Sequence, residues 1–574
     1  MSKVFSIFIF SILTVTAVFW PLYFADHFFL FLWPSMLWAL AIGFASSYQC
    51  WRAPLFTFFL ALLPIVAGAL YFGMAHASDD SFLLAGVIPW SDAAMHFRQA
   101  AQMAVYGITQ TGMNGRFLYP AYFSSLLTIC HYNLLMAETL CGCLFAAGLV
   151  VALRETARVI GVSGASVVAL VCWLFFRERC AGLIMTENLG IMCGVLSLAA
   201  FLRGLHGKHF YLVIVGIFML SLGLCARPGA LVVLPLLIAF SGWLGWQGGI
   251  SKKWGRLIQS LLAMVLALIV VLLAFHCNRI LAGSLYEGKV ITNQNFSFTL
   301  NGLLTGGKWS DCLGWSHWDS KLVMRENLRL IQEQPQLLFL GALRAYKEAL
   351  SHRTLFQFHQ ESRLATFLLI MAFIGLVALW KREQLRPYAL WLTLITVGIL
   401  LSIPFAPPWD AAERPFAATV PFQGLLAGVG FFALAHRFFV FDRSLPLPPS
   451  TMPRSDLGIL LLLVSLVFFL TVPWPLIHQK NLFTKEGTTS SMALYPGSFV
   501  LVTPENRFEL ESRMIPFLRH YPSEGEFLMH LPSHVFLGID WSNKNFDRSI
   551  FLNSVGETVP FRGWNVDQRL LPKK

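Results

Sequence analysis

The stretch that decides the fold is LIQSLLAMVLALIVVLLAFHCNRI, residues 257–280, which is apolar without interruption from Leu261 to Phe275. An apolar run of about 20 residues is long enough to cross the hydrocarbon core of a bilayer as a helix. Marking such windows along the whole chain predicts thirteen membrane spans. They are residues 4–24, 28–46, 53–72, 133–153, 163–177, 182–202, 210–226, 229–247, 257–280, 364–380, 387–405, 414–436 and 455–476.

The composition of the 574 residues points to the same class of protein. Apolar residues make up 56% of the chain and charged residues 13%, against about 45–50% and 25% in soluble proteins. A cytosolic globular enzyme is therefore excluded, and the 51 phenylalanines exclude a disordered chain. We expect an α-helical polytopic membrane protein in which the net charge of +12 reflects topology, with no nucleic-acid partner.

The loop charges predict the orientation of the chain. If the N-terminus is cytoplasmic, every inner loop is basic, as cytoplasmic loops are in membrane proteins. These loops contain Arg52, Arg154, Arg158, Arg203, Lys208, Lys252, Lys253, Arg256, Lys381, Arg382, Arg386, Arg437, Arg443 and Arg454. The short outer turns hold only Arg177, Arg179, Arg227 and Arg414. We therefore expect a multi-pass protein of the bacterial inner membrane with its N-terminus inside.

This topology divides the chain into six parts and places the long polar segments on the outer face. Residues 1–72, 133–280 and 364–476 are membrane helices, and residues 73–132 form an outer loop with interfacial helices. Residues 281–363 form a second outer loop or lid, with helices expected near 319–333 and 336–351. Residues 477–574 are expected to form a small α+β domain in the periplasm or outside the cell. The ten cysteines are interpreted mainly as apolar packing residues.

The first outer loop contains the most informative sequence, IPWSDAAMHFRQAAQMAVYGITQTGMNGRFLYPAYF, residues 88–123. Ser91 or Asp92 can cap a helix that continues to Gly107. Ala93, Phe97, Ala100 and Ala104 recur at helical spacing on one face, with Asp92, His96 and Gln99 on the other. We expect this helix to lie along the membrane surface, apolar side in the headgroups, with the Asp92 carboxylate at the boundary between lipid and water.

The arrangement of this loop resembles the GT-C superfamily of polytopic glycosyltransferases, which includes protein O-mannosyltransferases and aminoarabinose transferases of lipid A. The resemblance rests on Asp92 on a short helix, then Asn114-x-Arg116-x-x-Tyr119-Pro120 before an apolar segment. Shorter similarities follow in the same order along the chain. They are Thr186-Glu187, Ala226 to Ala230, Asn301 to Leu304 with Gly306-Gly307, Arg414, Pro421-Phe422 and Leu425 to Gly428. More than one predicted span precedes the loop, where the family usually has one.

The resemblance implies a polyprenyl-phosphate sugar donor and an acceptor that attacks the anomeric carbon as the phosphate leaves. Asp92 is then the candidate base, and the alternative is a helix cap. Arg227 is a candidate for binding the phosphate, and the alternative is snorkelling or an ion pair with Glu187. Arg414 is a second candidate for the phosphate, and the alternative is a local ion pair in its Pro-rich turn, which also contains Asp410 and Glu413.

The remaining candidates follow from the same loop and the neighbouring turns. His96 is positioned to orient Asp92 or to share a metal with it, and a plain interfacial histidine is the alternative. Asn114 and Arg116 are candidates for ordering the loop or contacting sugar, and Glu187 is a further substrate-binding candidate. Asp79 and Asp80 suggest a divalent cation as cofactor, since hard cations prefer carboxylate oxygens, whereas the alternative is a solvated acidic pair.

The sequence thus predicts a glycosyltransferase that moves a sugar from a polyprenyl-phosphate donor to an envelope glycan, lipid or protein acceptor on the outer face. A non-catalytic component of envelope-glycan assembly or transport is the alternative from another class. A polymerase or ligase of O-antigen type is a further alternative. A transporter is disfavoured, because it would place polar groups near the bilayer midplane and the predicted spans contain almost no acids.

Overall fold

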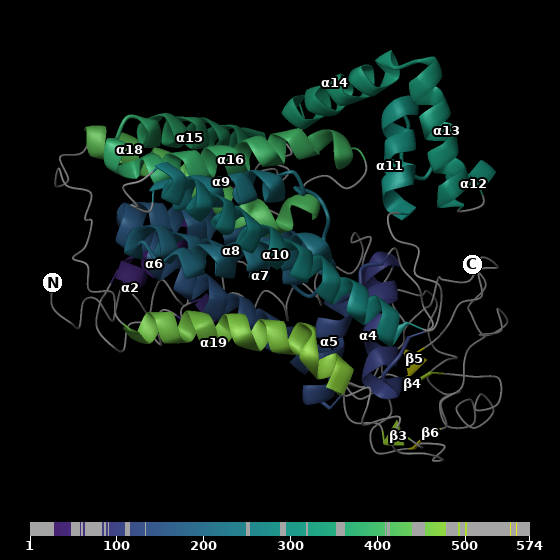
Figure 1. Ribbon diagram of the computed structural model, residues 1–574. Coiled ribbons are helices and arrows are strands. Elements are labelled where there is room, and N and C mark those ends of the chain that lie inside the picture. The colour runs from purple at the N-terminus through teal and green to yellow at the C-terminus, as the bar shows by residue number, and fades with distance from the viewer. Residues whose placement is uncertain are drawn as a thin grey trace.

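The structure is a computed structural model, drawn in Figure 1, and the residues that it describes are almost all helical. It describes residues 28–47, 58, 61–62, 83–84, 88–89, 91–109, 115–131, 134–247, 253–286, 294–316, 319–351, 362–407, 409, 414–438, 454–477, 492–493, 500–501, 551–552 and 558–559. The longest helices lie side by side in one bundle. They are α2 (Phe28–Ser47), α6 (Leu134–Arg179), α7 (Thr186–Gly207), α8 (Phe210–Ala226), α9 (Val233–Gln247), α10 (Lys253–Leu285), α15 (Ser362–Trp380), α16 (Arg386–Ser402), α18 (Val420–Phe438) and α19 (Arg454–Thr471).

The bundle has the length and composition of a helical membrane protein. Among the described residues, six apolar helices are long enough to cross a bilayer, and Phe210–Ala226, Val233–Gln247 and Leu364–Trp380 are shorter apolar helices. Helix α10 shows how the bundle meets its surroundings. Its small residues Ala263, Ala267 and Ala274 are buried, whereas Leu262 and Leu272 are 64% and 56% exposed. A leucine-rich outer surface of this extent is stable only against lipid.

The element α6 contains two of the predicted spans as two helices joined at a kink. Its backbone departs from helical geometry at Gly161, where φ is 74° and ψ is −174°. This conformation is accessible almost only to glycine, so the chain changes direction here. The break predicted between the spans 133–153 and 163–177 is therefore present, at Gly161. The rings of Phe145 and Phe176, one from each helix, stack with 4.4 Å between their centroids, so the two helices lie alongside each other.

Helices α4 (Ser91–Tyr106) and α5 (Leu118–Ile129) pack against each other at one end of the bundle (Figure 1). The helix expected after Ser91 is present, but the expectation for its apolar face is wrong. Ala93, Phe97 and Ala100 are at most 4% exposed and belong to the protein core, so they do not enter lipid. His96 is buried too, because it lies one turn from both Ala93 and Ala100 and shares their side of the helix.

The second long polar segment forms a separate group of helices, drawn at the upper right in Figure 1. They are α11 (Gln294–Thr305), α12 (Leu313–Ser316), α13 (Ser320–Glu333) and α14 (Gln336–Ser351). Asn327 of α13 joins two parts of α11, since its amide donates to the Ser297 carbonyl at 2.7 Å and accepts from Asn301 at 2.8 Å. The two helices expected near 319–333 and 336–351 are therefore present.

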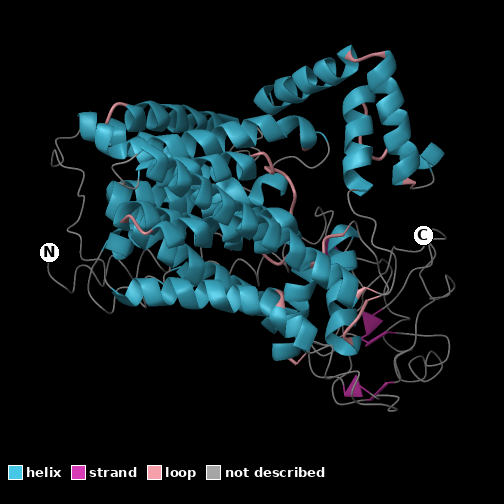
Figure 2. Cartoon of the chain, in the orientation of Figure 1, coloured by secondary structure: helices cyan, strands magenta, loops and turns pink. Residues whose placement is uncertain are grey.

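The short strands lie at the same end of the bundle as α4 (Figure 2). β1 (Leu83–Leu84) pairs with β2 (Ile88–Pro89), β3 (Met492–Ala493) with β6 (Thr558–Val559), and β4 (Val500–Leu501) with β5 (Phe551–Leu552), all antiparallel. Most of the segment 477–574, expected to form a small α+β domain, lies outside the described residues, as do most of the spans 4–24 and 53–72.

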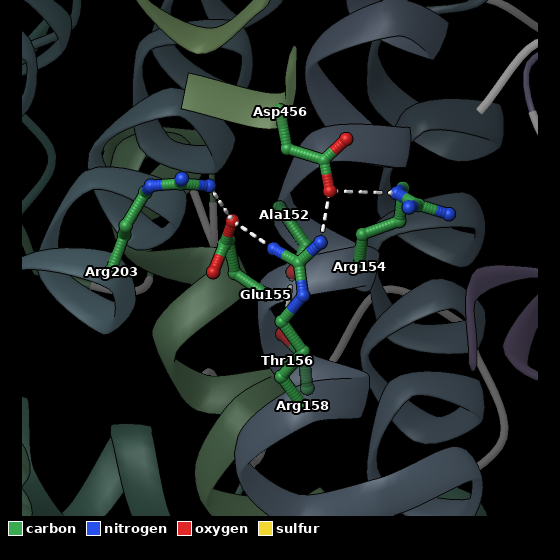
Figure 3. Close-up of polar contacts among 7 residues, drawn as sticks. All are labelled: Ala152, Arg154, Glu155, Thr156, Arg158, Arg203 and Asp456. Atoms are coloured by element: carbon green, nitrogen blue, oxygen red, sulfur yellow. Dashed lines mark hydrogen bonds and ion pairs between the residues drawn. The ribbon is translucent and has the colours of Figure 1, made fainter. Parts of the chain in front are cut away.

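Charged side chains form a buried network that joins α6, α7 and α19, which we call the Asp456 network (Figure 3). Arg203 Nη1 lies 2.8 Å from Glu155 Oε1, and Arg154 Nε lies 3.2 Å from Asp456 Oδ2. Arg158 bonds both carboxylates, and no side chain in the network is more than 9% exposed. Three arginines expected in basic inner loops are thus held inside the protein by acids.

Candidate functional site

A second charged cluster lies at the opposite end of α7, centred on Glu187, and we call it the Glu187 cluster. Glu187 is in the first turn of α7, sixteen residues before Arg203 of the Asp456 network. At about 1.5 Å per residue the two clusters are separated by about 24 Å along the helix. The Glu187 cluster also contains Asp92, Arg116, Arg227 and Arg414, which are all residues that the sequence analysis selected.

Glu187 is fully buried and its carboxylate is shared by two arginines. Oε1 accepts a hydrogen bond from Arg414 Nε at 2.5 Å and lies 3.6 Å from Arg227 Nε. Arg414 precedes α18 in the 3₁₀ helix η3 (Arg414–Thr419), and Arg227 follows the last residue of α8. Three segments far apart in the sequence therefore meet at one carboxylate. The pairing of Arg227 with Glu187, the alternative to a free phosphate-binding arginine, is present.

Close backbone packing brings Arg414 to this position. The segment η3 lies against α7 and against the turn after α8, and both contacts depend on glycine. A β-carbon on Gly194 would lie 2.4 Å from the carbonyl oxygen of Ala418, and one on Gly229 would lie 2.1 Å from that of Pro415. Only residues without a side chain allow this approach.

Asp92 lies at the accessible edge of the cluster. Its carboxylate oxygen Oδ2 is 3.5 Å from Arg414 Nη2, and its side chain is 41% exposed, against 12% for Arg414. Asp92 is in the first turn of α4, where a carboxylate also interacts favourably with the helix dipole. Arg414 thus links a buried carboxylate to one that a ligand can reach. The local partners considered for Arg414, Asp410 and Glu413, lie outside the described residues.

His96 lies one helical turn after Asp92 and is 2% exposed. Its ring packs edge-to-face on Tyr119 of α5, with 5.9 Å between the centroids. Burial lowers the pKa of His96 to about 4; the charges of Asp92 and Glu187 oppose the shift, whereas Arg116 and Arg227 add to it. The imidazole is therefore neutral at physiological pH, and it can orient neighbours without adding charge.

Arg116 approaches the cluster from the start of α5. Burial and the charge of Arg227 together lower the pKa of Arg116 to about 9, against the opposite effects of Asp92 and Glu187. The guanidinium remains charged at neutral pH. In the part of the chain that the structure describes, the Arg116 guanidinium has no ion pair or hydrogen bond. Among the described residues, three guanidinium groups therefore meet two carboxylates, an excess of one positive charge.

The backbone on both sides of Arg116 is held by a residue that the sequence analysis missed, Asn278 of α10. Its amide nitrogen donates to the Gly115 carbonyl at 2.6 Å, and its amide oxygen accepts from Phe117 N at 3.1 Å. Seven residues further along α10, the Leu285 carbonyl accepts from Thr109 N at 2.7 Å. A polar amide inside the apolar span 257–280 was the available signal, since such groups need a partner in a membrane helix.

Three predicted residues cannot be placed in this site. Asn114, Asp79 and Asp80 lie outside the described residues. Within the described ranges, no group of three or more His, Cys, Asp or Glu side chains is arranged to hold a metal ion. The chemistry that the described cluster can perform is therefore that of an anion-binding group beside an accessible carboxylate. A phosphate fits the excess of guanidinium groups, and Asp92 is available to accept a proton.

The cysteines that the structure describes are thiols. Cys180 and Cys312 are both buried and form no disulfide with each other. A comparison with protein-family models and one with curated proteins both find no match to this chain.

Proposed function

We propose that the protein is a GT-C-like glycosyltransferase of the bacterial inner membrane, which transfers a sugar from a polyprenyl-phosphate donor to a cell-envelope acceptor. In this proposal the N-terminus is cytoplasmic and thirteen spans place the Glu187 cluster on the outer face. The C-terminal residues form a small periplasmic α+β domain. The observation that carries the proposal is the position of Arg414 between buried Glu187 and accessible Asp92.

The proposed reaction forms one bond and breaks one. The acceptor atom attacks the anomeric carbon of the sugar, and the bond from that carbon to the phosphate oxygen breaks, so that the phosphate leaves with the electron pair. Asp92 takes the proton from the acceptor, since it is an accessible carboxylate. The guanidinium groups stabilise the charge on the leaving phosphate, which they can do without losing a proton.

Glu187 has a different role in this proposal from the one expected for a substrate-binding residue. It is 0% exposed and engaged by two arginines, so we assign it the positioning of Arg227 and Arg414. A buried carboxylate between two guanidinium groups holds both of them in place. His96 supports the same edge as a neutral neighbour of Asp92.

Replacing Asp92 by Asn tests the enzyme against the non-catalytic alternative. In cells that lack the wild-type copy, the Asp92→Asn protein should accumulate normally but fail to restore the envelope glycan, and the lipid-linked sugar should build up. The matched control is Asp311→Asn, an exposed acidic residue in the turn before α12, which should restore the glycan fully. Full restoration by the Asp92→Asn protein would exclude Asp92 as the catalytic base and favour a scaffold.

A further inference from the structure

Among the three arginines of the Glu187 cluster, Arg116 differs in what holds it. Arg227 and Arg414 are tied to Glu187 through their side chains. Arg116 has no such side-chain contact with a described residue, and its position is set through its backbone. Gly115, the residue before it, has φ of 70°, a conformation that favours glycine. The peptide groups on both sides of Arg116 then bond to one amide.

That amide belongs to a membrane helix and not to the loop. Asn278 uses both ends of its side chain, since Nδ2 donates to the Gly115 carbonyl and Oδ1 accepts from Phe117 N. The contacts span 161 and 163 residues of sequence. By bonding the carbonyl before Arg116 and the amide after it, the Asn278 side chain fixes the two peptide planes that flank Arg116. The direction in which the Arg116 side chain leaves the backbone is then fixed as well.

The direction matters because of the charges nearby. Arg227 and Arg414 repel the Arg116 guanidinium, whereas Asp92 and Glu187 attract it. An unpaired cation next to two others moves away unless its backbone is fixed or an anion joins it. The two hydrogen bonds of Asn278 fix the backbone of Arg116, and an incoming ligand would supply the anion.

We infer that Asn278 is a positioning residue that holds Arg116 as the anion-receiving arginine of the Glu187 cluster, where it meets the phosphate of a lipid-linked donor. The inference rests on the proposed function for the identity of the anion. It assigns different tasks to the three arginines. The charges of Arg227 and Arg414 are balanced by Glu187 and Asp92, and the charge of Arg116 is the one that the anionic ligand balances.

Two measurements on the full-length protein in detergent test the inference. The first is the rate at which phenylglyoxal modifies Arg116, followed by peptide mass spectrometry. Asn278→Ala frees the backbone of Arg116, so modification should become faster. The matched control is Asn327→Ala, which also removes an asparagine with two hydrogen bonds but between α11 and α13. Its Arg116 should react at the wild-type rate.

The second measurement is the affinity for undecaprenyl phosphate, by native mass spectrometry. Arg116→Ala should weaken binding by about tenfold or more, the loss of one charge-assisted contact. Asn278→Ala should weaken it in the same direction, and the double variant should match Arg116→Ala alone, because Asn278 acts through Arg116. A purely structural role would lower thermal stability and leave the affinity unchanged, or would multiply the two effects, and either result would overturn the inference.

The two readouts separate this inference from the proposed function. If the wild-type protein does not bind undecaprenyl phosphate, the proposed donor class fails, and the modification rate of Arg116 still decides whether Asn278 positions it. An unchanged rate in Asn278→Ala overturns the inference even when the donor binds. If Asn278→Ala does not fold, Asn278→Asp replaces it, since Asp keeps the acceptor for Phe117 N and loses the donor to the Gly115 carbonyl.

Discussion

Arg414 and Glu187, separated by 227 residues in the sequence, are joined by a 2.5 Å hydrogen bond from Nε to Oε1. The bond ties η3 to the first turn of α7, and Arg227 adds the turn after α8. A buried ion pair of this kind contributes little net stability over an apolar substitute, but breaking it by removing one partner is costly. The pair therefore specifies where the segments meet.

Replacing Glu187 by Gln should destabilise the protein strongly. The change leaves Arg227 and Arg414 close together without their carboxylate, and removing one partner of a buried ion pair costs about 3–5 kcal/mol. Thermal unfolding in detergent measures the loss. A second replacement, Arg414→Gln on the Glu187→Gln background, should restore part of the lost stability, because one of the two arginines that lost their carboxylate is then absent. Equal stability of the single and double variants would contradict the role assigned to Glu187.

Gly229→Ala should displace Arg414 without changing any charge. The added β-carbon would lie 2.1 Å from the Pro415 carbonyl oxygen, so η3 must move, at a cost of about 1–3 kcal/mol for overpacking. We expect loss of glycosyl transfer together with a lower Tm. Gly458→Ala in α19 is the control, because nothing lies within 4 Å of its β-carbon, and it should leave both properties unchanged or raise the Tm slightly.

The sequence was sufficient for several of the described helices, because local residue pattern specifies them. Helix α8 occupies residues 210–226 as predicted, and α13 begins one residue after the predicted start. Local pattern does not determine which side of α4 faces lipid, since packing against α5 buries the face that was expected in the headgroups. That outcome depends on a partner helix, which periodicity cannot identify.

The candidate site could be predicted as residue types but not as contacts. Arg227 and Glu187 were recognised as potential partners because both occur at the ends of neighbouring spans. The bonds from Arg414 to Glu187 and from Asn278 to Gly115 join segments 227 and 163 residues apart. The inner arginines show the same limit, since Arg154 and Asp456 are 302 residues apart. Charge alone suggested that Arg154, Arg158 and Arg203 are loop residues. Ion pairs with Glu155 and Asp456 instead hold them in the protein interior.

The stability of the protein should fall on acidification partly because of His96. Its pKa in the folded protein is lowered to about 4 by burial, below the value of about 6.5 in an unfolded chain. Between these values the unfolded chain binds a proton that the folded protein does not, so the contribution is complete above pH 6.5 and decreases as the pH falls towards 4. At about 1.4 kcal/mol per pKa unit, the loss is about 3 kcal/mol.

His96→Gln removes this contribution and keeps a polar side chain. The Tm of the wild-type protein should therefore decrease more between pH 7 and pH 4.5 than that of the variant, while the carboxylates titrate alike in both. Parallel Tm profiles for the two proteins over this range would show that His96 does not titrate as its burial requires.

The Asp456 network should hold the last membrane helix in place. Helix α19 is only about one-third buried over its apolar window, and Asp456 connects it to Arg154 and Arg158 of α6. Asp456→Asn leaves those arginines buried without a counter-charge, so we expect a loss of about 3–5 kcal/mol. Arg386→Ala, which removes an exposed pair with Glu383, should cost less than about 1 kcal/mol.

A cysteine placed at Ile459 reports the position of α19 directly, because the native side chain is partly buried against the bundle. In the otherwise wild-type protein this cysteine should react slowly with a membrane-permeant maleimide, and Asp456→Asn should accelerate the reaction if the ion pairs hold the helix. Because α19 leads to the outer C-terminal segment in the proposed topology, its release should also increase proteolysis of that segment from the outer side. A drop in Tm with unchanged reactivity at residue 459 would instead mean that the network stabilises α6 and α7 alone.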